Sequence, residues 1–160
     1  MRDEVTHGWA KVYPHLVYKS PLAAIAWLGP AFAFTERVRM ERPDGSFITA
    51  KLETPGGGLV MVTGHSPDTT EWIRERVPNF RKAQEDPWPL PMHVITVVVD
   101  DVDAHFRRAK QAGASTLMEP TDQPWGLRSY AAIDLEGHQW EFSQVLRLVE
   151  PEEWGARRIA

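Results

Sequence analysis

The chain has 160 residues, of which 42% are hydrophobic and 25% are charged, and this composition predicts one globular domain with a buried core. It contains no cysteine, which excludes disulfides, thiolate zinc sites and cysteine nucleophiles, and its net charge of −4, from 18 basic and 22 acidic residues, gives no reason to expect a nucleic-acid partner. No apolar run is long enough to span a bilayer and residues 1–10 lack a signal-peptide core, so we expect a cytoplasmic protein with no membrane partner.

The first half of the chain is rich in short β-branched and apolar runs separated by turn residues. These runs predict strands over residues 11–18, 34–40, 47–53 and 59–63. In the first strand Tyr13, His15 and Val17 alternate with other residues, so they share one face. Turns are predicted at residues 42–45 and 54–58, where proline, aspartate and glycine gather.

A helix is predicted directly after the first strand. Ser20 and Pro21 mark its start, because a serine side chain caps free backbone N–H groups and proline suits the first helical position. Further along, Gly29 and Pro30 predict a kink or an early end.

The second half repeats this order of elements. Strands are predicted over residues 92–99, 114–118, 127–133 and 139–145. Between the first two lies a helix that Asp101 can cap, with Val102, Phe106 and Ala109 on one apolar stripe and Gly113 at its C-terminal end. A turn at residues 134–137 separates the last two strands.

Equivalent positions in the two halves lie about 80 residues apart, as the pairs Gly57 and Gly137 and Met61 and Glu141 show. We therefore interpret the chain as one domain, residues 1–160, built from two βαβββ modules with an α+β fold. The boundaries, in chain order, are module 1 at 10–64, a linker at 65–91 with a short helix at 69–77, module 2 at 92–146, and a tail at 147–160, in which Trp154 predicts partial docking.

Two stretches of the second half, VVVDDVDAHFRRAKQAGAS and DQPWGLRSYAAIDLEGHQWEF, resemble the vicinal oxygen chelate superfamily. This superfamily includes glyoxalase I, bleomycin-resistance proteins and extradiol dioxygenases, and the resemblance is to its glyoxalase-like (PhnB-like) branch. It implies paired βαβββ modules whose sheets form cups around a small-molecule site, and a homodimer. It also implies that the first helix continues to about residue 32, followed by a glycine where this chain has Ala33.

Metal-dependent members of this superfamily take one ligand from the first and one from the last strand of each module. Carried over by resemblance, these positions are Tyr13, Met61, Val94 and Glu141. Glu141 matches the usual ligand types, whereas a thioether is a poor donor for hard divalent ions and valine has no donor. The resemblance therefore implies a damaged metal site with one catalytic or ligand carboxylate.

A second set of residues could supply the metal ligands. His15 shares a strand face with Tyr13, and a one-residue change in strand register would turn His93 into the position of Val94. His15, His93 and Glu141 would then form a two-histidine, one-carboxylate site for a divalent ion such as Zn, Ni, Mn or Fe. The simpler interpretation makes His15 a lining residue of the pocket and His93 a residue at the start of a strand.

Two residues near the third strand of module 2 are candidates for ligand contacts. Trp125 can stack on an aromatic or cationic ligand or anchor the core, and Arg128 can bind an anionic group or pair with Glu136. His138 belongs to the Gly-His-x-Trp turn and is expected to be structural, and no role is assigned to His105.

These residues predict a small-molecule-binding protein with no cofactor, whose cup is lined by aromatic, thioether and polar side chains and takes an aromatic or amphipathic ligand. The predicted ligand-binding residues are Tyr13, His15, Met61, Trp125 and Arg128, with Glu141 as the functional carboxylate. The alternative is a metal-dependent lyase, isomerase or dioxygenase that uses Glu141 together with His15, His93 or both.

Overall fold

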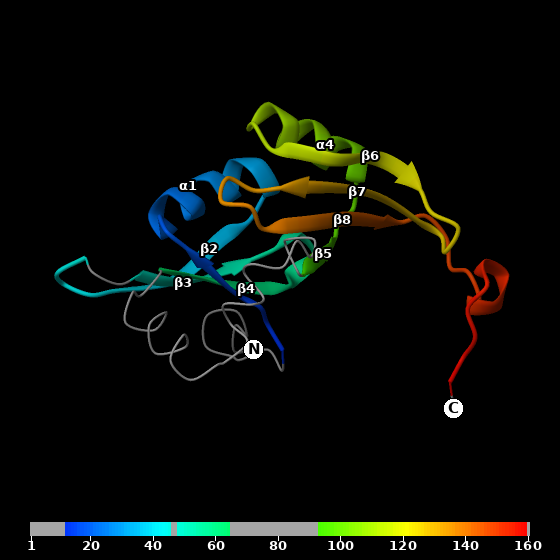
Figure 1. Ribbon diagram of the computed structural model, residues 1–160, viewed down its shortest axis with the longest axis horizontal. Coiled ribbons are helices and arrows are strands. Elements are labelled where there is room, and N and C mark those ends of the chain that lie inside the picture. The colour runs from blue at the N-terminus through cyan, green and yellow to red at the C-terminus, as the bar shows by residue number, and fades with distance from the viewer. Residues whose placement is uncertain (1–11, 46–47, 65–92, 160) are drawn as a thin grey trace, which may run out of the picture.

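The computed structural model describes residues 12–45, 48–64 and 93–159 (Figure 1). Their helices and strands, in chain order, are β1 (His15–Tyr18), α1 (Pro21–Phe32), β2 (Thr35–Glu41), β3 (Ile48–Glu53), η1 (Pro55–Gly57), β4 (Leu59–Gly64), β5 (Val94–Val98), α4 (Val102–Gln111), β6 (Ser115–Asp122), β7 (Leu127–Ile133), β8 (Gln139–Val145) and η2 (Pro151–Trp154). The helix predicted over residues 69–77 and the linker predicted over 65–91 lie outside the described residues.

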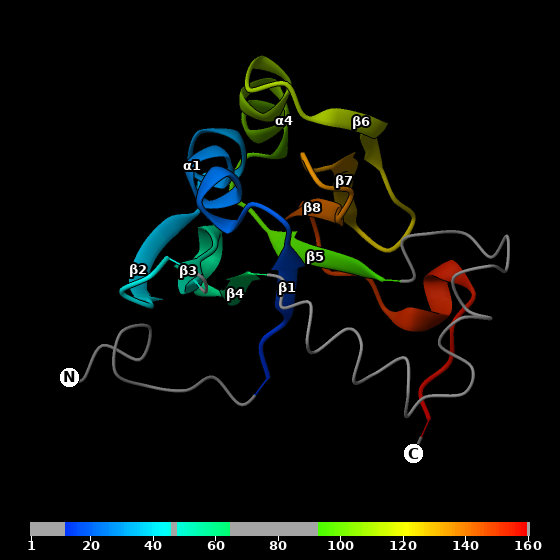
Figure 2. The same cartoon turned by 60° about the vertical axis from the view of Figure 1, so that its left-hand side comes forward.

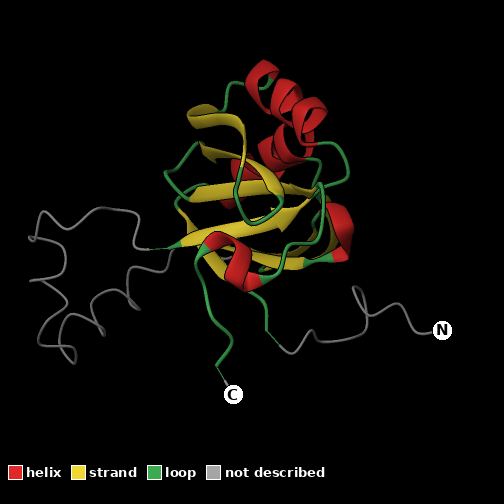
Figure 3. Cartoon of the chain, turned by 90° about the vertical axis from the view of Figure 1, so that its right-hand side faces the viewer, coloured by secondary structure: helices red, strands yellow, loops and turns green. Residues whose placement is uncertain are grey.

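The strands form two four-stranded mixed sheets with the same connectivity, ordered β1-β4-β3-β2 and β5-β8-β7-β6. In each sheet the first strand pairs in parallel with the last, and the remaining pairs are antiparallel. Helix α1 packs against α4, and the two helices lie together on one side of the molecule (Figures 2 and 3). The arrangement confirms the predicted α+β fold of two βαβββ modules, module 1 (β1–β4) and module 2 (β5–β8).

Most strand bounds lie within two residues of the prediction, and those of β1 and β6 differ by more. Strands β7 and β8 have the predicted limits. The predicted turn between them is closed by a hydrogen bond from the Gly137 N–H to the Asp134 carbonyl. Strand β1 begins only at His15, after Pro14, and not at residue 11. Strand β6 continues to Asp122, beyond the predicted end at residue 118.

Helix α4 has the predicted caps. The Asp101 carboxylate accepts a hydrogen bond from the Ala104 N–H at 2.8 Å, and Gly113 adopts a positive φ of 84° just after the helix. Arg108 and Lys110 lie in its last turn, where the helix dipole favours cations. Among the described residues no helix is long and apolar enough to cross a membrane.

The start of α1 differs from the prediction in its cap. The helix begins at Pro21 as expected, but the Ser20 side chain makes no capping hydrogen bond. The Glu136 carboxylate, from the β7–β8 turn of module 2, instead accepts hydrogen bonds from the backbone N–H groups of Lys19 at 2.7 Å and Ser20 at 2.9 Å. Module 2 therefore supplies the negative charge that the N-terminus of this helix favours.

The end of α1 is also anchored by module 2. The predicted early end at Gly29 and Pro30 is wrong, because α1 continues to Phe32, as the resemblance implies, with Pro30 inside it. The Arg108 guanidinium donates to the carbonyls of Pro30 at 2.7 Å and Gly29 at 3.0 Å. Ala33 ends the helix in the left-handed conformation (φ 59°) that glycine usually adopts.

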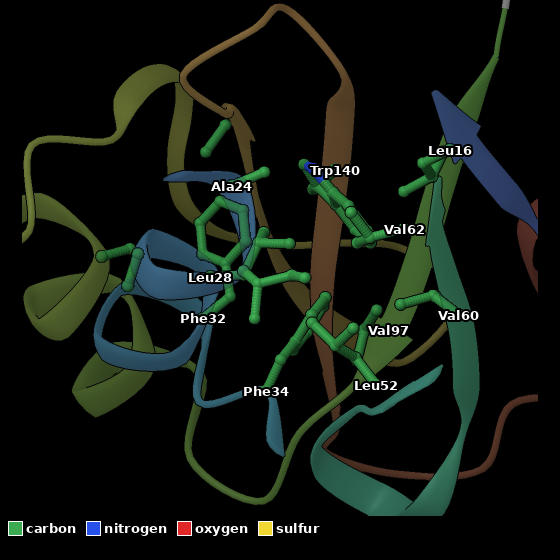
Figure 4. Close-up of a cluster of buried hydrophobic side chains, with 14 of the residues drawn as sticks. Leu16, Ala24, Leu28, Phe32, Phe34, Leu52, Val60, Val62, Val97 and Trp140 are labelled. Atoms are coloured by element: carbon green, nitrogen blue, oxygen red, sulfur yellow. The ribbon is translucent and has the colours of Figure 1, made fainter. Parts of the chain in front are cut away.

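One hydrophobic core extends through both modules (Figure 4). Phe32, at the end of α1, is fully buried, and its ring centroid lies 5.8 Å from that of Trp140 and 4.7 Å from that of Phe142, both in β8. Side chains of β1, β3, β4 and β5 converge on the same region (Figure 4). Because the helices and one face of each sheet bury this core, the opposite sheet faces remain for other contacts.

Candidate functional site

Each sheet has two different faces, because side chains alternate along a strand. In β1, Leu16 and Tyr18 are buried in the core, whereas His15 and Val17 point the other way and are exposed. We call the side of each sheet that points away from this core the helix-free face. The helix-free face comprises, in module 1, His15, Val17, Thr49, Lys51, Met61 and Thr63 and, in module 2, Val94, Thr96, Val98, Ser129, Glu141 and Ser143.

Three predicted site residues gather on the helix-free face of module 1. The rings of Tyr13 and His15 stack with centroids 5.2 Å apart and planes 24° apart. His15 lies opposite Met61 in the parallel pairing of β1 with β4, and Met61 lies opposite Lys51 in β3. The row His15–Met61–Lys51 thus brings residues with an imidazole, a thioether and an ammonium group to adjacent strand positions.

Glu141 lies on the helix-free face of module 2. It is partly buried, with Thr96 of β5 and Ala131 of β7 as its neighbours across the strands. The Ser143 hydroxyl donates a hydrogen bond to Glu141 Oε1 at 3.2 Å, and the hydroxyls of Ser129 and Ser143 are 2.8 Å apart. As the alternation along β8 predicts, the carboxylate points away from the buried aromatic residues of the same strand.

Met61 and Glu141 occupy equivalent positions in the two modules but have different chemistry. Met61 and Glu141 are each the central residue of a cross-strand row and are 80 residues apart by subtraction, as are their neighbours Lys51 and Ala131. Module 1 therefore presents a thioether beside a cation where module 2 presents a carboxylate beside a methyl group.

At the ligand positions that the resemblance implies, the described side chains do not form a complete divalent-metal site. At the module 1 ligand position in β4, Met61 offers a thioether, and Lys51, its neighbour in β3, brings a positive charge. His93 is exposed just before β5, with its ring centroid 6.0 Å from that of His138. Within the described residues, no three histidine, aspartate or glutamate side chains are placed to hold one metal ion, so His15, His93 and Glu141 do not form such a group there.

Arg128 is on the opposite side of its sheet from Glu141. Its guanidinium forms ion pairs with Asp103 of α4, at 3.1 Å, and with Asp122 of β6, at 2.6 Å. Hydrogen bonds to these two carboxylates raise the pKa of Arg128. The arginine therefore does not pair with Glu136, which instead caps α1.

Trp125 lies at the end of module 2 beside the tail. Its ring packs edge-on against Trp154, with centroids 6.1 Å apart, and 41% of the residue is exposed. The carbonyl of the next residue, Gly126, accepts hydrogen bonds from the N–H groups of Leu146 and Arg147. These contacts confirm that part of the tail docks, and they place Trp125 away from the row of Glu141.

His105, to which the sequence analysis gave no role, is buried. Its Nε2 donates to the Phe32 carbonyl at 3.0 Å, so in the neutral ring Nδ1 accepts from the Tyr130 hydroxyl at 2.7 Å. Burial lowers the pKa of His105, and the charge of Arg108 lowers it further, whereas the bond to Phe32 opposes this shift. The sequence could have indicated the burial of His105, because this residue lies three positions after Val102 on the apolar stripe of the helix.

Two hollows in the described surface lie next to these groups. One, of about 340 Å³, lies between η1 with the start of β4 and strand β5, and its lining includes Thr96, the neighbour of Glu141. The other, of about 400 Å³, lies between the end of α1 and the start of α4, beside His105 and Arg108. His15, Met61 and Glu141 line neither of these two hollows, and Met61 and Glu141 are partly buried on their sheets.

Comparison with known proteins gives consistent matches. The family model for the Glyoxalase/Bleomycin resistance protein/Dioxygenase superfamily matches residues 15–142. The uncharacterized protein Mb0911c of Mycobacterium bovis is 34% identical over 140 residues, which cover 88% of this chain and 86% of that protein.

Solved structures show the same fold. TioX from Micromonospora sp. ML1 is 33% identical, with a TM-score of 0.60 over 86% of this chain and 100% of that one. A glyoxalase/bleomycin resistance protein/dioxygenase family enzyme from Burkholderia phytofirmans is 19% identical, with a TM-score of 0.57 over 84% of this chain and 97% of that one. The latter similarity concerns the fold alone.

Proposed function

Because the chain belongs to the Glyoxalase/Bleomycin resistance protein/Dioxygenase superfamily, we propose that it is a small-molecule-binding protein that acts without a complete metal site. The observation that carries the proposal is the row His15–Met61–Lys51. A thioether and an ammonium group at this place do not suit a divalent ion, but they suit an organic ligand with an apolar body.

The ligand class follows from the side chains around this row. The stacked rings of Tyr13 and His15 offer an aromatic surface, and Met61 is a soft, polarizable neighbour. In module 2, Val94 and Val98 are 48% and 54% exposed on the same kind of face, with Glu141 beside them. We therefore propose an aromatic or amphipathic ligand, bound by packing and a few polar contacts.

The proposal extends to a homodimer, as the resemblance to the superfamily implies. Each four-stranded sheet has two edge strands, β1 and β2 in module 1 and β5 and β6 in module 2. Exposed apolar side chains such as Val17 and Val98 lie on these edge strands, where a second chain could cover them.

A second candidate function is a metal-dependent lyase, isomerase or dioxygenase. It is favoured by one observation, the partly buried Glu141 carboxylate, whose Oε1 accepts one hydrogen bond and whose Oε2 can still bind another group. In this alternative, Glu141 with His15, His93 or both would hold the ion. The ion would polarise neighbouring substrate oxygens.

The test is a calorimetric titration of chelator-treated protein with three probes of one shape, para-aminobenzamidine, para-aminobenzamide and para-aminobenzoate. We expect at least one to bind, and Tyr13→Ala to weaken it roughly 2- to 10-fold, since an aromatic contact contributes about 0.5–1.5 kcal/mol. Tyr13→Phe keeps the ring and is the matched control, so it should bind like the unmodified protein. If the folded, metal-free protein binds no probe, or binds only after metal loading, the proposal fails.

A further inference from the structure

A chain of hydroxyl groups ends on the functional carboxylate of module 2. Ser129 and Ser143 are 1% and 0% exposed, so their hydroxyls must be satisfied within the protein. The Ser143 hydroxyl donates its proton to Glu141 Oε1, and the hydrogen bond between the two serines must therefore run from Ser129 to Ser143. The chain has one direction, from Ser129 through Ser143 to Glu141.

Module 1 contains the same hydroxyl pair without the carboxylate. Thr49 and Thr63 occupy the positions equivalent to Ser129 and Ser143, each 80 residues earlier by subtraction, and their hydroxyls are 3.1 Å apart. Both pairs lie on the helix-free face between the last two strands of a module. At the position of Glu141, however, module 1 has Met61.

The surroundings of Glu141 suit a ligand with a positive charge. Among the described residues, no lysine, arginine or histidine forms an ion pair with this carboxylate. Its Oε1 is held by Ser143, which leaves Oε2 to accept from another group. Across the strand pair, Thr96 is exposed, and Val94 and Val98 on either side offer apolar surface.

We propose that Ser143 and Ser129 are positioning residues that fix Glu141 as the acceptor for a protonated nitrogen group, an amidinium, guanidinium or ammonium, of a ligand whose apolar body packs on β5. The inference rests on the proposed function and names the charge of its ligand. Two donors in series orient the carboxylate before the ligand arrives, so less conformational freedom is lost on binding. A hydrogen bond to an ionised group is also stronger than one between neutral groups.

The test compares the affinities of para-aminobenzamidine, which carries an amidinium group, and para-aminobenzamide, its neutral counterpart. In the unmodified protein the cation should bind more tightly, on the order of 10-fold or more, because a charged hydrogen bond is involved. Glu141→Gln should remove this preference. Ser143→Ala should reduce it roughly 2- to 10-fold, and Ser143→Thr, which restores the hydroxyl with the residue that module 1 uses, should recover it.

The matched control is Thr63→Val, which removes the equivalent hydroxyl where no carboxylate follows, and it should leave the cation preference unchanged. General structural damage lowers both affinities together, so the ratio of the two separates positioning from stability. Equal affinities for cation and amide in the unmodified protein, or a ratio that Ser143→Ala does not change, would overturn the inference. If the neutral probe still binds in that case, the proposed function stands; if neither probe nor para-aminobenzoate binds, both fail.

Discussion

Replacing Asp134 with alanine is expected to lower the free energy of unfolding by about 3–5 kcal/mol, because several donors lose their acceptor inside the protein. Asp134 is only 6% exposed. Its carboxylate accepts hydrogen bonds from the Tyr18 hydroxyl at 2.6 Å, from Trp140 Nε1 at 3.1 Å, and from the backbone N–H groups of Glu136 and His138 at 3.0 Å each. Since Tyr18 belongs to β1, this one carboxylate joins module 1 to module 2.

Urea unfolding followed by circular dichroism measures this effect. The control is Asp100→Ala, which removes an exposed carboxylate and should change the stability by less than about 0.5 kcal/mol. Tyr18→Phe removes a single donor and should fall between the two. Burial, and then the negative charge of Asp134, raise the pKa of Tyr18, so its hydroxyl remains a donor at neutral pH. Equal stabilities of Asp134→Ala and Asp100→Ala would contradict this account.

Replacing His105 with alanine is expected to cost about 2–4 kcal/mol, from a cavity and two lost hydrogen bonds. The imidazole ring lies with its centroid 4.3 Å from that of Phe142 and 6.3 Å from that of Phe32. Without it, the buried Tyr130 hydroxyl and the Phe32 carbonyl lose their partner. His93→Ala, which removes an exposed ring, is the control and should have a small effect.

The same histidine should make stability depend on pH. Burial lowers the pKa of His105 in the folded protein, whereas the unfolded chain binds the proton near pH 6.5. The unfolded state therefore holds more protons below about pH 6.5, and the free energy of unfolding falls as the pH is lowered to the folded pKa, by up to about 1.4 kcal/mol per pH unit. Urea unfolding between about pH 7.5 and pH 5 should show this slope, and His105→Phe should flatten it. An unchanged slope in His105→Phe would show that other groups cause it.

The strand pattern of the sequence predicts the fold and the faces of the candidate site. Alternation along β8 is enough to place Glu141 opposite the buried aromatics, and alternation along β1 places His15 and Val17 on one face, because the two-residue period is a local property. The 80-residue repeat can likewise be recognised from the spacing of the predicted turns and strands. These features need no information about the partner element.

Contacts between the modules could not be predicted in the same way. Pro30 is accommodated in α1, and Ser20 is left without a capping role, because Arg108 and Glu136 reach both ends of this helix from the other module. Arg128 pairs with Asp103 rather than with Glu136, because α4 packs over its sheet. Each partner is distant in sequence, so neither propensity nor periodicity identifies it.

The central claim, ligand binding without a complete metal site, is tested most directly by elemental mass spectrometry of protein purified without a histidine tag. Samples before and after reloading with Zn, Ni, Mn and Fe(II) are compared with Glu141→Ala treated in parallel. We predict no stoichiometric metal in any sample and no difference between the two proteins, because the Met61 thioether stands at an implied ligand position with the charged Lys51 opposite it across the strands. One tightly held ion per chain that is lost in Glu141→Ala would contradict the account and favour the metal-dependent enzyme.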